Sequence, residues 1–194
     1  MHEEIEIKFL EVDIPTLEEK FLSYGATRVG ETLSRITNFD FPDYRLKSDH
    51  AWVRLRTEFG KTTLTYKQRI GAVSSDTSLR DEGMREIEIT VSDFETMRKL
   101  LHAIGMIEKF SQERKRIHFE KDDLSFDIDT WPLIPPYLEI EGNSWENVEK
   151  AASDLGFDYD SHLRCSAGNI LTKYGYPDHD YSIFTFSEQI KKNL

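Results

Sequence analysis

Paired glutamates recur three times in the sequence, each time in a short stretch that alternates polar and apolar residues. The pairs are Glu4 and Glu6 in EEIEIKF, Glu86 and Glu88 in REIEITV, and Glu139 and Glu141 in LEIEG. Residues two apart on a β-strand point to the same face, so each pair sets two carboxylates side by side. Carboxylate oxygens are the ligands that hard divalent cations prefer.

Basic residues show the same spacing on other strand-like stretches. The cationic set is Lys8, Arg54, Arg56, Lys67, Arg69, Arg114 and Arg116, with His118 on the same face as the last two. Another acidic pair, Asp127 and Asp129, follows on the next stretch. Lys and Arg bind phosphate oxygens, and Arg can do so with two parallel hydrogen bonds.

Seven stretches therefore combine one charged face with one apolar face. An antiparallel sheet with one solvated side explains any single stretch. It explains the set less well, because charges of one sign repel when they lie two apart on a strand face. If the sheet closes into a barrel with the charges inside, they must pair or bind ions. A polyphosphate chelated to Mg²⁺ or Mn²⁺ offers partners for both signs, so we predict a metal–triphosphate ligand.

The alternation predicts eight strands that position these residues, and each is bounded by turn residues. They cover residues 3–10, 33–41, 50–58, 61–69, 84–91, 111–121, 124–131 and 133–142. The fold class expected is α+β: a single-domain, eight-stranded antiparallel barrel with a charged interior and helices packed outside.

Three helices are predicted, each following a Glu-x-Glu strand and each stopped by a glycine. They cover residues 16–24, 92–105 and 144–156, with Ser92 and Ser144 as N-terminal caps. Residues 71–83, rich in Gly, Ser and Asp, are predicted to form a flexible loop. We assign residues 1–175 to the tunnel domain, and residues 176–194 to a tail with a short helix that packs on it.

Composition places the chain among globular proteins that work in the cytoplasm. Its 194 residues suffice for one domain, and its single cysteine, Cys165, excludes an intrachain disulfide. The formal net charge of −11 argues against a nucleic-acid partner. No apolar run approaches the ~20 residues of a membrane span, and no basic-then-apolar leader precedes the first strand. The oligomeric state is left open, with a homodimer as one option.

The ordered set of motifs resembles the CYTH, or triphosphate tunnel metalloenzyme, superfamily. The likeness begins with the Glu-x-Glu-x-Lys strand and the segment NFDFPDYRL, and it continues through the charged pairs to the last Glu-x-Glu, over roughly residues 3–175. The resemblance implies an eight-stranded tunnel that acts on triphosphate compounds with a divalent metal. Members of the superfamily include inorganic, thiamine and nucleoside triphosphatases and class IV adenylyl cyclases.

By this resemblance, Lys8, Arg54, Arg56, Lys67, Arg114 and Arg116 would hold the phosphates. Arg69, one step beyond Lys67 on the same strand face, would either contact phosphate at the tunnel mouth or face solvent. Glu4, Glu6, Asp127, Glu139 and Glu141 would hold one or two metals, with Asp129 as a substitute for Asp127. Catalysis would rest on Glu4, Glu6, Lys8 and Lys67. Glu86 and Glu88 would either bind metal or pair with the cations, and His118 would act as a base or pair with a carboxylate.

The expected activity is hydrolysis of inorganic triphosphate or another triphosphate compound by a metal-dependent phosphoanhydride hydrolase. Cyclisation of ATP to cyclic AMP is an alternative. By resemblance, the cyclases carry a His-Phe element ahead of the first strand, and only Met1, His2 and Glu3 precede Glu4 here. A noncatalytic polyphosphate-binding protein is a second alternative, but phosphate capture alone would need only the cations.

Overall fold

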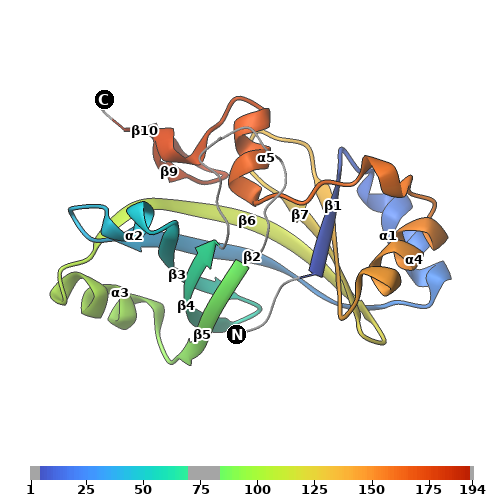
Figure 1. Ribbon diagram of the computed structural model, residues 1–194, viewed down its shortest axis with the longest axis horizontal. Helices are drawn as coiled ribbons and strands as arrows, with labels where there is room; N and C mark the ends of the chain where they lie inside the picture. Colours follow the sequence, from blue (N-terminus) through green and yellow to red (C-terminus); the bar gives the residue numbers. More distant parts are fainter. Residues whose placement is uncertain (1–4, 70–83, 193–194) are drawn as a thin grey trace.

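Residues 5–69 and 84–192 of the computed structural model are described, and they form one curled β-sheet with helices on both of its faces (Figure 1). The strands are β1 (Ile5–Leu10), β2 (Thr27–Asp40), β3 (Ala51–Glu58), β4 (Lys61–Arg69), β5 (Met84–Val91), β6 (Ile107–Lys121), β7 (Leu124–Thr130), β8 (Tyr137–Gly142), β9 (Tyr181–Phe184) and β10 (Gln189–Lys191). The helices are α1 (Ile14–Tyr24), α2 (Arg45–Ser48), α3 (Phe94–Ala103), α4 (Trp145–Asp154) and α5 (Ala167–Lys173). The loop expected at 71–83 lies outside the described residues.

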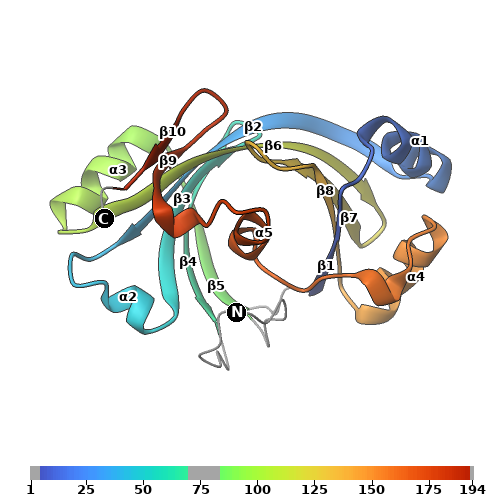
Figure 2. The same cartoon turned by 90° about the horizontal axis from the view of Figure 1, so that it is seen from above.

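Eight strands pair in the order β1-β8-β7-β6-β2-β3-β4-β5, and every neighbouring pair in this series is antiparallel. The sheet curls into a half-barrel, as the view from above shows (Figure 2). Within the described residues, β1 and β5 form its two edges and do not pair with each other. The predicted α+β class, with eight antiparallel strands curled into one sheet and helices outside, is thus confirmed, and the described strands form a half-barrel.

The outer face of the curl carries the apolar half of each strand. At one end, Ile7 of β1, Phe119 of β6 and Leu138 of β8 pack with Phe21 of α1 and Val148 of α4 in one buried cluster. At the other end, Leu55 and Phe39 pack against Phe94 and Leu101 of α3. Since the period of two places these side chains outside, the charged residues between them must face the hollow of the sheet.

A third buried cluster lies on the inner side, where α5 sits within the curve of the sheet (Figure 2). Ile170 and Leu171 of α5 pack there with Trp131, Tyr137 and other apolar residues. The indole Nε1 of Trp131 donates a hydrogen bond to the Tyr137 hydroxyl at 2.9 Å. The concave face is therefore apolar near α5 and charged elsewhere.

The helix ends agree with the predicted caps and glycine stops except at the start of α3. Gly25 ends α1 in the left-handed conformation, with φ 87°, and the Ser144 hydroxyl accepts the Asn147 N–H at the start of α4. The predicted cap Ser92 is wrong. Asp93 is the N-cap of α3, and its carboxylate accepts the Thr96 N–H. Ser92 and Asp93 are both good caps, so the sequence did not decide between them.

Several elements begin at other residues than expected: α1 at Ile14 rather than 16, β6 at Ile107 rather than 111, and β8 at Tyr137 rather than 133. The largest differences are in β2 and in the tail. β2 begins at Thr27 rather than at residue 33, because its first part pairs with β6 from Glu120 to Arg116 even though it is polar and contains a glycine. The tail contains the one-turn 3-10 helix η2 (Asp178–Asp180), and the sequence did not predict the two short strands that follow it. β9 pairs in parallel with β6 at Ser111 and Gln112, which joins the tail to the main sheet.

Candidate functional site

The concave face brings the sequence-predicted residues into cross-strand rows. One row joins Lys8 of β1, Glu139 of β8, Asp127 of β7 and His118 of β6. A second row joins Glu6, Glu141 and Ser125. Carboxylates and cations from separate parts of the chain are therefore neighbours because the register aligns them.

Lys8 is the most deeply buried cation of the first row, with a residue exposure of 1%. Its Nζ lies 2.5 Å from Glu6 Oε1 and 3.3 Å from Glu139 Oε1. Burial favours the neutral amine, but the charges of Glu139 and Glu6 outweigh it and raise the pKa of Lys8 above its ordinary value. Lys8 thus remains an ammonium in the hollow of the sheet.

Two arginines of β6 share one buried carboxylate. Asp129 is fully buried and accepts hydrogen bonds from Arg114 Nη1 at 2.9 Å and from Arg116 Nε and Nη2 at 2.7 Å each. Arg116 also contacts Asp127 Oδ2 and Glu139 Oε2, each at 2.6 Å. One guanidinium therefore connects three of the predicted metal ligands.

Asp127 and Asp129 have different surroundings. Asp127 is in register with Glu139 and bonds His118 Nδ1 at 2.6 Å, while Asp129 is in register with Tyr137 and serves the two arginines. Asp127 is thus the aspartate that is in register with a glutamate of the Glu-x-Glu pair. His118 also lies 3.0 Å from Glu120, and its hydrogen bond to Asp127 raises the pKa of the imidazole.

Glu58 is a member of the site that the sequence analysis missed. Its side chain is 13% exposed, and it contacts Arg114 Nη2 at 2.5 Å and Arg56 Nη1 at 3.3 Å. Burial raises its pKa, but the guanidinium groups of Arg114, Arg56 and Arg116 outweigh burial and lower the pKa of Glu58 to about 2. The alternation of Arg54, Arg56 and Glu58 along one strand face was the signal that could have identified it.

The strands β3, β4 and β5 continue the charged surface to the far edge of the sheet. Lys67 Nζ lies 2.9 Å from Glu86 Oε2, and Arg56 Nη2 lies 3.9 Å from Glu88 Oε2. Glu88 also accepts the Thr65 hydroxyl at 2.8 Å. In this state Glu86 and Glu88 pair with cations.

Two further predicted cations lie on the same strands. Arg54 is half-buried and in register with Thr65. Arg69, the last residue of β4, donates from Nη2 to the Ser166 hydroxyl at 3.0 Å, and its guanidinium lies 5.8 Å from the centroid of the Trp52 ring. Arg69 thus joins the end of β4 to the N-cap of α5.

The carboxylates of β1, β7 and β8 have the oxygen donors that a hard divalent ion needs. Glu6 and Glu141 face each other across β1 and β8, and Glu139 and Asp127 form the next row. Among the described residues, no three acidic, histidine or cysteine side chains converge closely enough to bind one ion. Glu4 lies outside the described part of the chain. The carboxylate oxygens of these residues are suitable ligands for a divalent metal. In this structure, two of them, Glu6 and Glu139, pair with Lys8.

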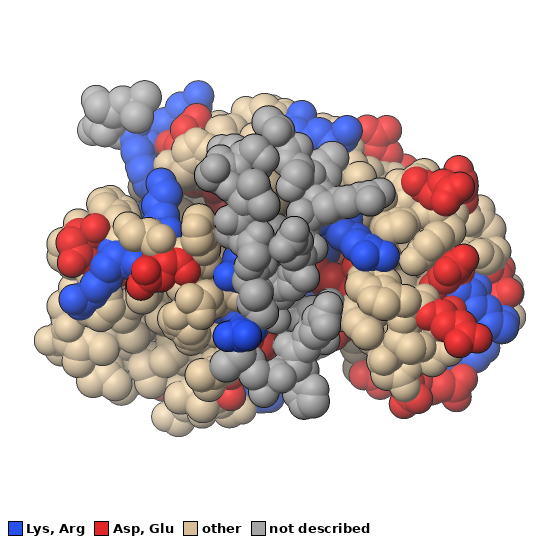
Figure 3. Space-filling model, viewed as in Figure 1, with Lys and Arg blue, Asp and Glu red and all other residues tan. Residues whose placement is uncertain are grey.

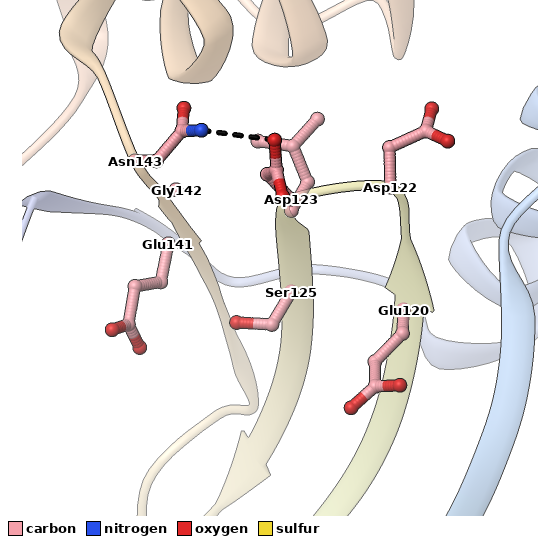
Figure 4. A pocket seen from close by; sticks show the side chains of 8 residues that line it. Glu120, Asp122, Asp123, Ser125, Glu141, Gly142 and Asn143 are labelled. Carbon is pink, nitrogen blue, oxygen red and sulfur yellow. Dashed lines mark hydrogen bonds between the residues drawn. The ribbon is translucent and has the colours of Figure 1, made fainter.

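An acidic pocket of about 410 Å³ lies where β6, β7 and β8 meet. Figure 4 shows Glu120, Ser125 and Glu141 pointing in one direction from these three strands, below Asp122 and Asp123 of the turn. The side chain of Asn143 donates to Asp123 Oδ2 at 2.9 Å. The pocket continues the Glu6–Glu141–Ser125 row, so it belongs to one end of the same charged surface.

Charge is distributed unevenly over the molecule. On the face shown in Figure 3, acidic side chains predominate over α1 and α4. Many of the cations instead point into the hollow of the sheet, where Lys8, Lys67 and Arg114 are buried. Every helix within residues 5–69 and 84–192 is too short or too polar to cross a bilayer.

Comparison with known proteins identifies relatives of this fold. A family model described as the CYTH domain matches residues 2–170. A proposed adenylate cyclase from Vibrio parahaemolyticus superposes with a TM-score of 0.73 at 12% identity, over 88% of this chain and 98% of that one. A conserved hypothetical protein from Pyrococcus furiosus gives a TM-score of 0.67 at 18% identity, over 87% and 99%.

A third solved structure is that of a proposed adenylyl cyclase from Hippeastrum, described as having a dominant triphosphatase activity. It has a TM-score of 0.57 and 15% identity, over 89% of this chain and 96% of that one. At these identities the likeness shows the fold alone. No curated protein matches the sequence.

Proposed function

This chain belongs to the CYTH domain family, and from that premise we propose that it is a metal-dependent triphosphatase acting on inorganic triphosphate or another triphosphate compound. The observation that carries the proposal is the concave face, where seven of the eight strands bring cations and carboxylates together, as in the row of Lys8, Glu139 and Asp127. A charged surface of this kind is costly unless its charges are paired or bind ions. A triphosphate with its metal supplies partners for both signs.

The cations would bind and orient the phosphates. Arg54, Arg56 and Lys67 come from β3 and β4, Arg114 and Arg116 from β6, and Lys8 from β1, so the substrate would be held from several sides. Holding a reactant in a fixed geometry lowers the barrier to its reaction. Arg69 would bind at the end of the site, beside Ser166.

Glu6, Glu139, Glu141 and Asp127 would hold Mg²⁺ or Mn²⁺ together with Glu4, with Asp129 as the substitute for Asp127. When bound there, the ion would neutralise phosphate charge and favour attack on phosphorus. Lys8 would release Glu6 and Glu139 to the ion and turn its ammonium toward the phosphates. The contacts of Lys8 at 2.5 and 3.3 Å support this exchange of partners, because they place one cation beside two candidate ligands.

The direct test is release of orthophosphate from inorganic triphosphate by the purified protein with Mg²⁺ or Mn²⁺. We expect turnover that EDTA abolishes and added metal restores. Glu6→Gln should lose turnover by about 100-fold, because a neutral amide is a poor ligand for a hard cation. Glu31→Gln, a surface glutamate paired with Arg28, is the matched control and should keep full activity. Turnover that resists EDTA would refute the metal assignment.

A further inference from the structure

Glu58 connects three adjacent strands on the concave face. It ends β3, and its Oε1 accepts the hydroxyl of Ser34 on β2 at 2.6 Å and Arg114 Nη2 on β6 at 2.5 Å. Ser34 and Arg114 are in register across β2 and β6. The other oxygen of Glu58 lies 3.3 Å from Arg56 Nη1. A single carboxylate thus fixes two guanidinium groups from strands that are not neighbours.

The two arginines use only part of their hydrogen-bonding capacity. The Nε atoms of Arg56 and Arg114 and the hydroxyl of Thr63 are buried and have no hydrogen-bond partner among the described residues. Thr63 is in register with Arg56 on the adjacent strand β4. A buried donor without a partner costs about 1–3 kcal/mol. Arg56 and Arg114 both contact Glu58, and Thr63 lies across from Arg56 on the same face of the sheet, so the three donors are available to an acceptor that is a separate molecule.

The carboxylate of Glu58 is suited to hold the arginines rather than to bind metal. It lies among three guanidinium groups, which keep its pKa at about 2, so it is ionised throughout the neutral range. Its three contacts are with donors on β2, β3 and β6. The described carboxylates that we propose as metal ligands, Glu6, Asp127, Glu139 and Glu141, lie on β1, β7 and β8.

We propose that Glu58 is a positioning residue for triphosphate binding: it holds Arg56 and Arg114 so that their Nε–H groups and the Thr63 hydroxyl bind one phosphoryl group together. This inference rests on the proposed function and identifies one part of the same site. The phosphoryl oxygens accept the three hydrogen bonds, and no covalent step involves Glu58.

The test measures KM and kcat for inorganic triphosphate with Mg²⁺ in Glu58→Gln, Thr63→Val and the double variant. In Glu58→Gln we expect KM to rise about tenfold, which corresponds to about 1.4 kcal/mol of lost binding, while kcat changes much less. Thr63→Val should raise KM about threefold in the wild-type background and have little effect in Glu58→Gln, since its hydroxyl then no longer acts with positioned arginines. A merely structural Glu58 would lower the amount of active protein without changing KM.

Glu108→Gln is the matched control. Glu108 also accepts a hydrogen bond from an arginine, Arg98 Nη1, at 2.7 Å. Arg98 belongs to α3, which lies outside the site. Its replacement should leave KM unchanged. If Glu58→Gln does not fold, Ser34→Ala decides, because it removes only the hydroxyl that fixes Glu58; we expect KM to rise about twofold to fivefold.

The outcomes separate this inference from the proposed function. If the wild type hydrolyses triphosphate and neither Glu58→Gln nor Ser34→Ala changes KM, Glu58 is not a positioning residue. If the wild type binds triphosphate without hydrolysing it, calorimetry with Mg²⁺ gives the dissociation constant instead. An approximately tenfold weaker affinity of Glu58→Gln would then support the inference while the triphosphatase proposal fails. Absence of both binding and hydrolysis in the wild type would overturn both.

Discussion

Charged residues on the concave face hold one another in place. Glu139 illustrates the balance: burial raises its pKa, but Lys8, Arg116 and Arg114 together lower the pKa well below its ordinary value. Breaking one partner of such a buried pair leaves an uncompensated charge, which typically costs about 3–5 kcal/mol. Each cation is therefore both a candidate phosphate ligand and a structural partner, and activity measurements need a stability measurement beside them.

Lys67 allows phosphate binding to be tested with a close control. Lys67→Met keeps most of the apolar stem and removes a charge that is buried on β4 beside Glu86. We expect KM for inorganic triphosphate to rise about tenfold, because a charge-assisted hydrogen bond to phosphate contributes about 1.5–3 kcal/mol. Lys61→Met, on the exposed start of the same strand, should keep the wild-type KM. Equal KM values for the two variants would remove Lys67 from the site.

Glu58 also predicts how stability depends on pH. Its folded pKa of about 2 lies below the ordinary value of 4.5, so the carboxylate stabilises the fold above pH 4.5 and this contribution is lost as the pH falls toward 2. The shift corresponds to about 3 kcal/mol. Urea unfolding should show wild type more stable than Glu58→Gln at pH 7, with a gap that narrows between pH 4.5 and 2. A gap that is constant with pH would mean that the charge of Glu58 contributes nothing.

Strands were easier to predict than the contacts between them. The alternation of polar and apolar residues predicted the ends of β3, β4 and β5 to within one residue, because it is strict in these three strands. The first half of β2 escaped notice because it is stabilised by pairing with β6 rather than by an apolar face of its own. The partners of Lys8 and Arg116 could not be read from the sequence either, because strand order and register decide them.

Gly142 shows how closely a strand and a helix approach behind the site. A Cβ at this position of β8 would lie 2.9 Å from both Leu124 Cδ2 and Val148 Cγ2. Gly142→Ala should therefore reduce the free energy of unfolding by about 1–3 kcal/mol, as overpacking does. In Gly30→Ala, the new Cβ would meet Phe59 at an ordinary 3.4 Å, so the change should stay within about 0.5 kcal/mol. Urea unfolding would measure the free energy of unfolding of both variants. A similar loss in the two would contradict close packing of α4 on β8.

At the scale of the whole molecule, we propose that residues 1–175 form the tunnel domain and that residues 176–194 pack on it. The apolar cluster inside the curl includes Tyr181 and Phe184 from the tail, exposed by 6% and 1%. The sequence predicted a tail with a short helix, but it did not indicate that the aromatic residues beyond it would be buried. Their alternation extends over only four residues, too few for a reliable strand signal.

Replacement of single tail aromatics tests this assignment. Phe184→Ala should reduce the free energy of unfolding by about 3–5 kcal/mol, because it empties a position in the buried cluster. Phe186→Ala, two residues on and 37% exposed, should have a much smaller effect. Chemical denaturation of both variants gives the comparison. If the urea midpoint of Phe184→Ala equals that of the wild type, the tail is an accessory segment rather than a part of the core.

Phosphorus NMR would show whether the charged hollow hydrolyses a triphosphate. Purified protein with Mg²⁺ or Mn²⁺ would be given inorganic triphosphate in one tube and ATP in another. We predict orthophosphate with pyrophosphate from inorganic triphosphate, and no product in a parallel tube that contains EDTA. Cyclic AMP with pyrophosphate from ATP, or unchanged triphosphate in the presence of metal, would refute the proposed triphosphatase activity.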